Sequence, residues 1–190
     1  MLKHLFTKKY PKETKYLFEG TSNWNQFDKK LQEVAEQLKI RLGAEYLTII
    51  GDGFEVLIEG FIKLTENDNR FGISNYEPVQ SKDDYGVDGY GNNIRGNKSA
   101  IQIKYRIDPT YFLTAQNDGL DSMVTEALHM GILFGEGTDY RHFIFTSAKG
   151  LNNKTDDNKF RGKVKCYGID DIKTIVDNNQ NFWNNFKTFI

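Results

Sequence analysis

Two short segments of this chain carry side chains that could do chemistry together. Residues 84–89 read Asp-Tyr-Gly-Val-Asp-Gly and have the glycines of a tight turn. Residues 100–106 read Ala-Ile-Gln-Ile-Lys-Tyr-Arg and alternate apolar with polar residues, which predicts a strand with one buried face. The alternation places Gln102 and Lys104 on the same face, roughly 6–7 Å apart. With the carboxylate of Asp88 beside them, they would form a site for a hard metal ion next to a cation.

Hydrolysis of a phosphodiester is the chemistry that these residue types suit. The negative charge of the diester repels hydroxide and the alkoxide is a poor leaving group, and a divalent metal ion relieves both difficulties. Mg²⁺, or Mn²⁺ in its place, takes oxygen ligands, for which Asp88, Gln102 and the Ile103 backbone carbonyl are the candidates. Lys104 would act on the attacking water or on a phosphate oxygen. The alternative is an ordinary Asp-Gly turn beside a solvated strand face.

Apolar periodicity predicts the elements that must position these residues. Helices are expected over 24–42, from about 51 to 64, over 118–134, from about 170 to 176 and over 182–189. Strands are expected over 73–80, 98–106, 141–147 and 160–169, with a turn-rich segment over 82–91. This order predicts an α/β fold, a mixed β-sheet with helices on both faces. On the second helix Glu55 and Glu59 share one face, which is by default a solvent face.

The composition fits one compact unit. The chain has 190 residues, 38% of them hydrophobic, which is enough to bury a substantial core. Residues 1–45 are expected to be an N-terminal arm with a helical extension, and residues 46–190 the main domain. The Lys-rich start, residues 1–16, is predicted to be a flexible arm or short lead-in, with a nucleic-acid-binding arm as the alternative. The net charge of −1 requires any nucleic-acid surface to be local.

Cysteine and histidine usage excludes several classes of protein. The single cysteine, Cys166, allows no intrachain disulfide, which favours a reducing, cytoplasmic location. No apolar run reaches the roughly 20 residues that a membrane helix needs, so a membrane partner is not expected. His4, His129 and His142 lack the spacing of a zinc site and are expected to be structural or exposed.

The two segments and their flanks resemble the PD-(D/E)xK nuclease superfamily, and within it the Mrr-like, restriction endonuclease-like branch. The resemblance covers about residues 53–175. Gly53-Phe54-Glu55 is similar to the Phe-Glu element of the family's first helix. Residues 84–88 are similar to its Asp-x-Gly-Ile/Val-Asp turn, and residues 100–104 to its Ala-Ile-Gln-x-Lys strand. Residues 143–147 resemble a later core strand, and residues 167–172 resemble the closing strand and helix.

This resemblance implies a restriction endonuclease-like core and a Mg²⁺-dependent DNA endonuclease of restriction or phage type. Asp88, Gln102 and Glu55 would hold the metal, and Lys104 would assist the attacking water. No proline precedes Asp88, and Gln102 makes the site less acidic than a glutamate would. A DNA-binding or targeting module of a larger assembly, with little cleavage of its own, is therefore the second hypothesis. An RNA-directed or branched-DNA nuclease is the third.

Candidate DNA contacts flank the expected site. Tyr105 and Arg106 follow Lys104 directly. Four further cations alternate with other residues and would share one face of an extended segment that tracks a phosphate backbone: Lys159, Arg161, Lys163 and Lys165. A charged edge strand that resists aggregation is the alternative for them. The partners expected with DNA are a second copy of the chain, needed to cut both strands, or a helicase or restriction protein.

Overall fold

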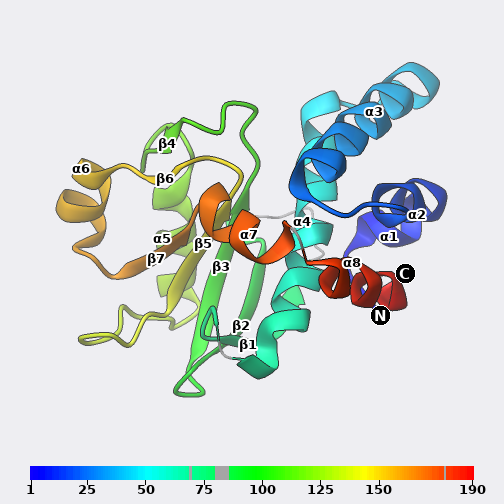
Figure 1. The fold of residues 1–190 in the computed structure, drawn as a ribbon. Coiled ribbons are helices and arrows are strands. Elements are labelled where there is room, and N and C mark those ends of the chain that lie inside the picture. Colours follow the sequence, from blue (N-terminus) through cyan, green and yellow to red (C-terminus); the bar gives the residue numbers. More distant parts are fainter. Residues whose placement is uncertain (69, 80–85, 178) are drawn as a thin grey trace.

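The computed structural model describes residues 1–68, 70–79, 86–177 and 179–190, so Asp84 and Tyr85 of the expected turn lie outside the described residues. Within these ranges the protein has a five-stranded mixed sheet in the order β1-β2-β3-β5-β7 with helices on both faces, which confirms the predicted α/β class (Figure 1). Its strands are β1 (Ile73–Pro78), β2 (Gly89–Asn93), β3 (Lys98–Lys104), β5 (His142–Thr146) and β7 (Val164–Tyr167). The first three are antiparallel, whereas β5 and β7 run parallel to β3. Two short strands, β4 (Phe112–Leu113) and β6 (Gly150–Leu151), pair separately.

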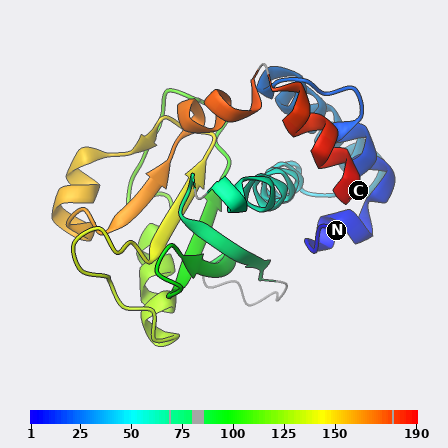
Figure 2. The same ribbon diagram turned by 60° about the horizontal axis from the view of Figure 1, so that its bottom comes forward.

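The two long helices beside the sheet cover opposite faces of it (Figure 2). Helix α4 (Tyr46–Thr65) packs with Ile101 and Ile103 of β3 in the larger of two apolar cores. Helix α5 (Leu120–His129) packs in the second core with Ala100 of β3. The predicted alternation along β3 is therefore confirmed, but the prediction of a single buried face is wrong because helices bury both. Gln102 consequently lies on the α5 face and is completely buried.

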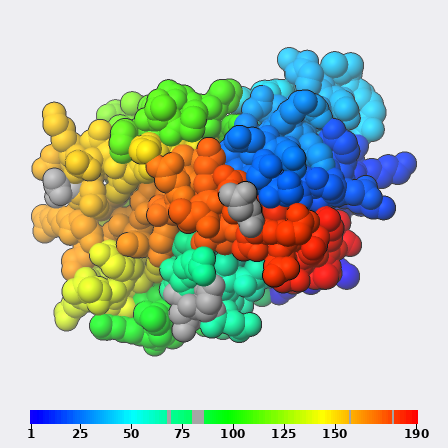
Figure 3. Space-filling model, viewed as in Figure 1, coloured from blue at the N-terminus to red at the C-terminus, as the bar shows by residue number. Residues whose placement is uncertain are grey.

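The N-terminal segment is folded, so the prediction of a flexible arm is wrong. Residues 1–18 contain helices α1 (Leu5–Lys9) and α2 (Pro11–Phe18), whose apolar side chains enter the larger core. Phe18 stacks on Phe186 with ring centroids 4.1 Å apart, and the Leu2 amide donates to the Phe189 carbonyl at 3.4 Å. Both ends of the described chain therefore gather on the same side of the molecule (Figure 3). The remaining helices are α3 (Trp24–Leu42), α6 (Asn153–Thr155), α7 (Ile169–Val176), α8 (Gln180–Phe186) and the short turns η1 (Glu66–Asp68), η2 (Asp156–Phe160) and η3 (Lys187–Phe189).

Several boundaries differ from prediction for local reasons. Helix α4 begins at Tyr46 rather than near residue 51 and runs through Gly53, where an added Cβ would lie 2.3 Å from Leu31 Cδ1. That glycine serves the close approach of α3 and does not start the helix. Helix α5 ends at His129 rather than at residue 134, and Leu128 and Leu133 are 41% and 59% exposed.

Two strand predictions also need correction. Strand β2 begins inside the segment predicted to be turn-rich. Its sequence is mostly glycine and asparagine, which are typical of turns, and so the pattern did not predict a strand there. Residues 160–163 are not extended, since the π-turn η2 ends at Phe160 and Arg161 follows with φ 52°.

In the part of the chain that the structure describes, no helix combines the length and apolarity needed to cross a bilayer.

His142 is a buried histidine for which the structure shows no hydrogen-bonding partner. It is fully buried on β5, 4.7 Å from the Phe134 ring, and neither ring nitrogen bonds to any described residue. Burial, with the nearby charge of Arg141, lowers its pKa from 6.5 to about 4. The unfolded chain therefore takes up this proton first as the pH falls. The stability that depends on neutral His142 is complete above about pH 6.5 and is lost toward pH 4.

We expect His142→Leu to be at least as stable as the wild type at pH 7 and clearly more stable at about pH 4.5, because leucine removes two unsatisfied nitrogens and the titrating group. The full pH-dependent difference is about 3 kcal/mol. Urea unfolding at both pH values measures it. His129→Gln, at an exposed histidine, serves as the control and should track the wild type. An unchanged pH dependence in His142→Leu would contradict the assignment.

Candidate functional site

A hollow of about 860 Å³ lies against the C-terminal half of β3. Gly86, Gln102 and Lys104 line it from the sheet side. Its other wall comes from α5 and the residue before it: Gly119, Asp121, Ser122, Thr125, Glu126 and His129. Two of the residues predicted to do chemistry, Gln102 and Lys104, therefore contribute to the lining of one hollow.

Asp88 is fixed at the point where the chain enters β2. Its amide donates to the Ile101 carbonyl at 3.0 Å on one side, and its carbonyl accepts from Val79 at 2.9 Å on the other. Its carboxylate Oδ2 accepts a hydrogen bond from the Ile103 amide. Since the amide and carbonyl of a strand residue point to the same edge, the Ile103 carbonyl also lies toward Asp88. The three expected oxygen donors, from Asp88, Gln102 and Ile103, thus come from adjacent positions on β2 and β3.

Gly86 brings the turn before Asp88 against the start of α5. It has φ 96°, a left-handed value that favours glycine, and an added Cβ would lie 3.0 Å from both the Met123 amide nitrogen and Ser122 Cβ. A larger residue would push the turn away from the helix. The glycine therefore closes one end of the hollow.

Gln102 is the least expected residue of the site. It is completely buried, and neither its Oε1 nor its Nε2 has a hydrogen-bonding partner among the described residues. A buried polar group left without a partner costs about 1–3 kcal/mol, so native structures rarely keep one unless it serves a ligand or a bound water. The orphaned amide oxygen beside Asp88 fits a hard cation such as Mg²⁺.

Lys104 ends β3 with a side chain that is half-buried at the hollow. Its carbonyl accepts from Thr146 Oγ1 at 2.8 Å and from the Ser147 amide at 3.2 Å, which fixes its backbone to β5. No acidic side chain in the described ranges forms an ion pair with its ammonium group. The charge of Lys104 is therefore available to a ligand in the hollow.

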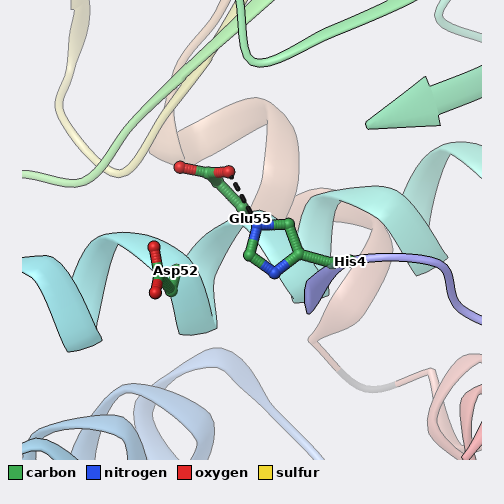
Figure 4. A group of neighbouring side chains, drawn as sticks. All are labelled: His4, Asp52 and Glu55. Carbon is green, nitrogen blue, oxygen red and sulfur yellow. Dashed lines mark hydrogen bonds and ion pairs between the residues drawn. The ribbon is translucent and has the colours of Figure 1, made fainter. Parts of the chain in front are cut away.

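Glu55 is not brought to this hollow. It lies on α4, which covers the opposite face of the sheet, and its Oε2 is 3.0 Å from His4 Nε2. With Asp52 the three ligand atoms lie within 4.8 Å of one another (Figure 4). Burial, followed by the charge of Glu55, raises the pKa of Asp52 to about 6.

This second cluster suits a shared proton better than a metal ion. His4 Nδ1 accepts from the Phe6 amide at 3.2 Å, where the histidine caps α1. That bond places the ring proton of neutral His4 on Nε2, facing Glu55, whereas a metal ion would need the lone pair of the same nitrogen. The cluster therefore anchors the N-terminus to α4.

The structure does not gather the expected DNA contacts at the hollow. The Tyr105 hydroxyl donates to Asp28 Oδ1 at 2.6 Å and its ring packs edge-on against Phe54, so the side chain faces α3 and α4. The Arg106 guanidinium forms an ion pair with Asp118, which is buried. Both side chains are held within the protein rather than directed to the hollow.

The expected single cationic face of residues 159–165 is not formed, because only Lys165 belongs to a strand. Its ammonium lies over the rings of Tyr140 and Tyr167, at 5.8 and 5.6 Å from their centroids. Lys159 lies in η2 with its ammonium 3.8 Å from Asp121 Oδ2, while Arg161 and Lys163 lie in the turn that follows.

Sequence patterns alone did not identify the α5 wall. The buried side chains Leu120, Met123 and Ala127 give an ordinary amphipathic helix, so its polar residues read as a solvent face. The only available signal was the position of this helix after the strand that carries Lys104.

Comparison with known protein families, with characterised proteins and with solved structures finds no match. Functional inference therefore depends on the residues of this chain.

Proposed function

We propose that this chain is a Mg²⁺-dependent DNA endonuclease with a restriction endonuclease-like core, PD-(D/E)xK and Mrr-like in type. One observation carries the proposal: Gln102, whose fully buried side-chain amide has no hydrogen-bonding partner among the described residues, neighbours Ile103, whose amide binds the carboxylate of Asp88, and shares the lining of the hollow with Lys104. The mixed sheet with a helix on each face is compatible with that core.

The residues present fit a hard divalent cation. Asp88, the Gln102 side-chain oxygen and the Ile103 carbonyl would hold Mg²⁺ or Mn²⁺, with water completing the coordination. The bound ion supplies charge neutralisation on the phosphate and activation of water. Lys104 stabilises negative charge on the phosphate oxygens as the diester is attacked. The Ile103 amide keeps Asp88 oriented.

One such site would cut one strand at a time. Cleavage of both strands therefore requires a second copy of the chain, or a helicase or restriction partner. With DNA as substrate and a single cysteine, we place its action in the cytoplasm. The second candidate function, a DNA-binding module with little cleavage of its own, is favoured by the neutral ligand at position 102.

Nicking of supercoiled plasmid tests the proposal. We expect nicking by the purified chain with Mg²⁺, none with EDTA, and a loss of about 100-fold or more in Asp88→Asn, since asparagine keeps the shape but removes the charge. Asp170→Asn, at an exposed aspartate of α7, is the matched control and should cleave as the wild type. Cleavage that survives both EDTA and Asp88→Asn would overturn the proposal.

DNA binding by the folded wild type without any nicking would replace the proposal with the binding-module function. A panel of duplex, single-stranded, junction and RNA substrates identifies the substrate class. Preferential cleavage of RNA or of junctions would replace the duplex assignment.

A further inference from the structure

Glu126 lies on the helical wall that faces Gln102 and Lys104 across the hollow. Leu120, Met123 and Ala127 of α5 are buried against the sheet, so Glu126 occupies the adjacent polar side of the helix. The side chain is 24% exposed, so the protein covers most of it.

The direction of α5 sets Glu126 level with the proposed cation site. Ser122 lies next to Gly86, two residues before Asp88. The helix then leads into β5, which runs parallel to β3 and pairs His142 with Ala100, so α5 must run back along β3 toward its start. Glu126, four residues after Ser122, is about 6 Å farther along. That displacement carries it from the level of Gly86 toward the level of Asp88 and Gln102.

The strands supply one carboxylate to the proposed cation site, and a divalent cation can take a second. Asp88 is the only acidic residue within residues 86–104, the described stretch that contains β2, β3 and the turn between them, and Gln102 is neutral. Magnesium sites in proteins use one or two carboxylates. Of the two acids on the helical wall, Asp121 is 49% exposed and lies 3.8 Å from the Lys159 ammonium. Glu126 is less exposed, and among the described residues its one charged neighbour within ion-pair distance is the exposed His129 ring, at 3.9 Å.

We propose that Glu126 supplies the second carboxylate of the divalent-cation site, from the helix rather than from position 102 of the strand. This inference rests on the proposed function, since it assumes the cation site at Asp88. The Gln102 amide, which has no hydrogen-bonding partner among the described residues and belongs to the lining of the same hollow, then serves as a neutral ligand beside the two carboxylates.

Mn²⁺ binding to the full chain without DNA, measured by isothermal titration and by the Mn²⁺ paramagnetic resonance signal, tests the inference. Glu126→Gln should weaken the affinity about 10-fold or more, because cation affinity depends on the number of charged ligands. Asp121→Asn, on the same helix and the same hollow, is the control and should change it less than about 3-fold. Adding Gln102→Glu to Glu126→Gln should restore tighter binding, since the second carboxylate returns on the strand.

The outcomes separate this inference from the proposed function. If Asp88→Asn abolishes Mn²⁺ binding while Glu126→Gln binds as the wild type does, the inference is overturned and the cation site at Asp88 stands. If neither variant changes the affinity, or the wild type binds no Mn²⁺, both are overturned. Thermal unfolding of each variant shows whether lost Mn²⁺ binding comes from the cation site or from loss of the fold. Because Glu126 is partly exposed, Glu126→Gln should fold.

Discussion

Lys104→Met should lower the rate of plasmid nicking by about 10²–10³-fold without weakening Mn²⁺ binding. The ammonium of Lys104 is half-buried at the hollow and has no acidic partner among the described residues, so its charge can act on a substrate phosphate. Methionine keeps the length and apolar stem of lysine and removes only the charge. The loss should therefore appear in the maximal rate, measured from plasmid nicking at saturating Mg²⁺.

Lys98→Met provides the matched control for this experiment. Lys98 begins the same strand, on the same face, and its ammonium lies over the Tyr90 ring, 4.6 Å from the centroid, at the end of β3 away from Lys104. We expect its variant to cleave within about 2-fold of the wild type. Equal losses in the two variants would indicate a general effect of positive charge on DNA binding. Full activity in Lys104→Met would remove Lys104 from the mechanism.

Local patterns predicted much of the sheet because alternation along a strand depends on the strand alone. Ile101 and Ile103 pack toward α4, and Gln102 and Lys104 lie on the opposite face, as the period of two requires. The same pattern could not show that α5 covers the second face. Whether Gln102 is solvated or buried depends on a helix from elsewhere in the chain. Its burial is what makes the Gln102 amide a candidate ligand, because an amide on the surface would bind water instead.

The placement of Glu55 also depended on information that local patterns lack. The Phe-Glu sequence correctly lies on a helix before the sheet, but the helix face that carries Glu55 turns to His4. His4 belongs to a segment that was predicted to be flexible. The prediction relied on the many lysines of this segment and not on its short apolar repeat, Leu2 and Phe6, which packs in the larger core. Long-range packing of the N-terminus on α4 therefore decided the environment of both acids of that helix.

Glu59, four residues after Glu55, is the acid that this packing affects most. Periodicity assigned it to solvent, yet it is fully buried. Its carboxylate accepts from the Lys3 amide at 2.6 Å, from the His4 amide at 2.9 Å and from the Lys63 ammonium at 2.5 Å. The carboxylate thus satisfies two backbone donors and neutralises one cation where α1 begins.

Glu59→Ala is therefore expected to destabilise the fold by about 3–5 kcal/mol, because it removes the buried partner of the Lys63 ammonium and leaves one buried and one partly buried amide without an acceptor. Urea unfolding at pH 7 measures the loss. Glu55→Gln is the control on the same helix: Glu55 is 21% exposed, makes one bond to His4, and should cost about 1 kcal/mol. Similar losses in the two variants would contradict the role assigned to Glu59.

The same variant separates stability from chemistry. Glu59 lies on α4, across the sheet from the hollow that Gln102 and Lys104 line. At low temperature, where Glu59→Ala remains mostly folded, its nicking rate per folded molecule should equal that of the wild type. Hydrogen exchange should rise first in residues 1–18, because their anchoring acceptor is lost, and least in β3 and β5. A selective loss of nicking with unchanged exchange would instead place the N-terminal anchor in the catalytic machinery.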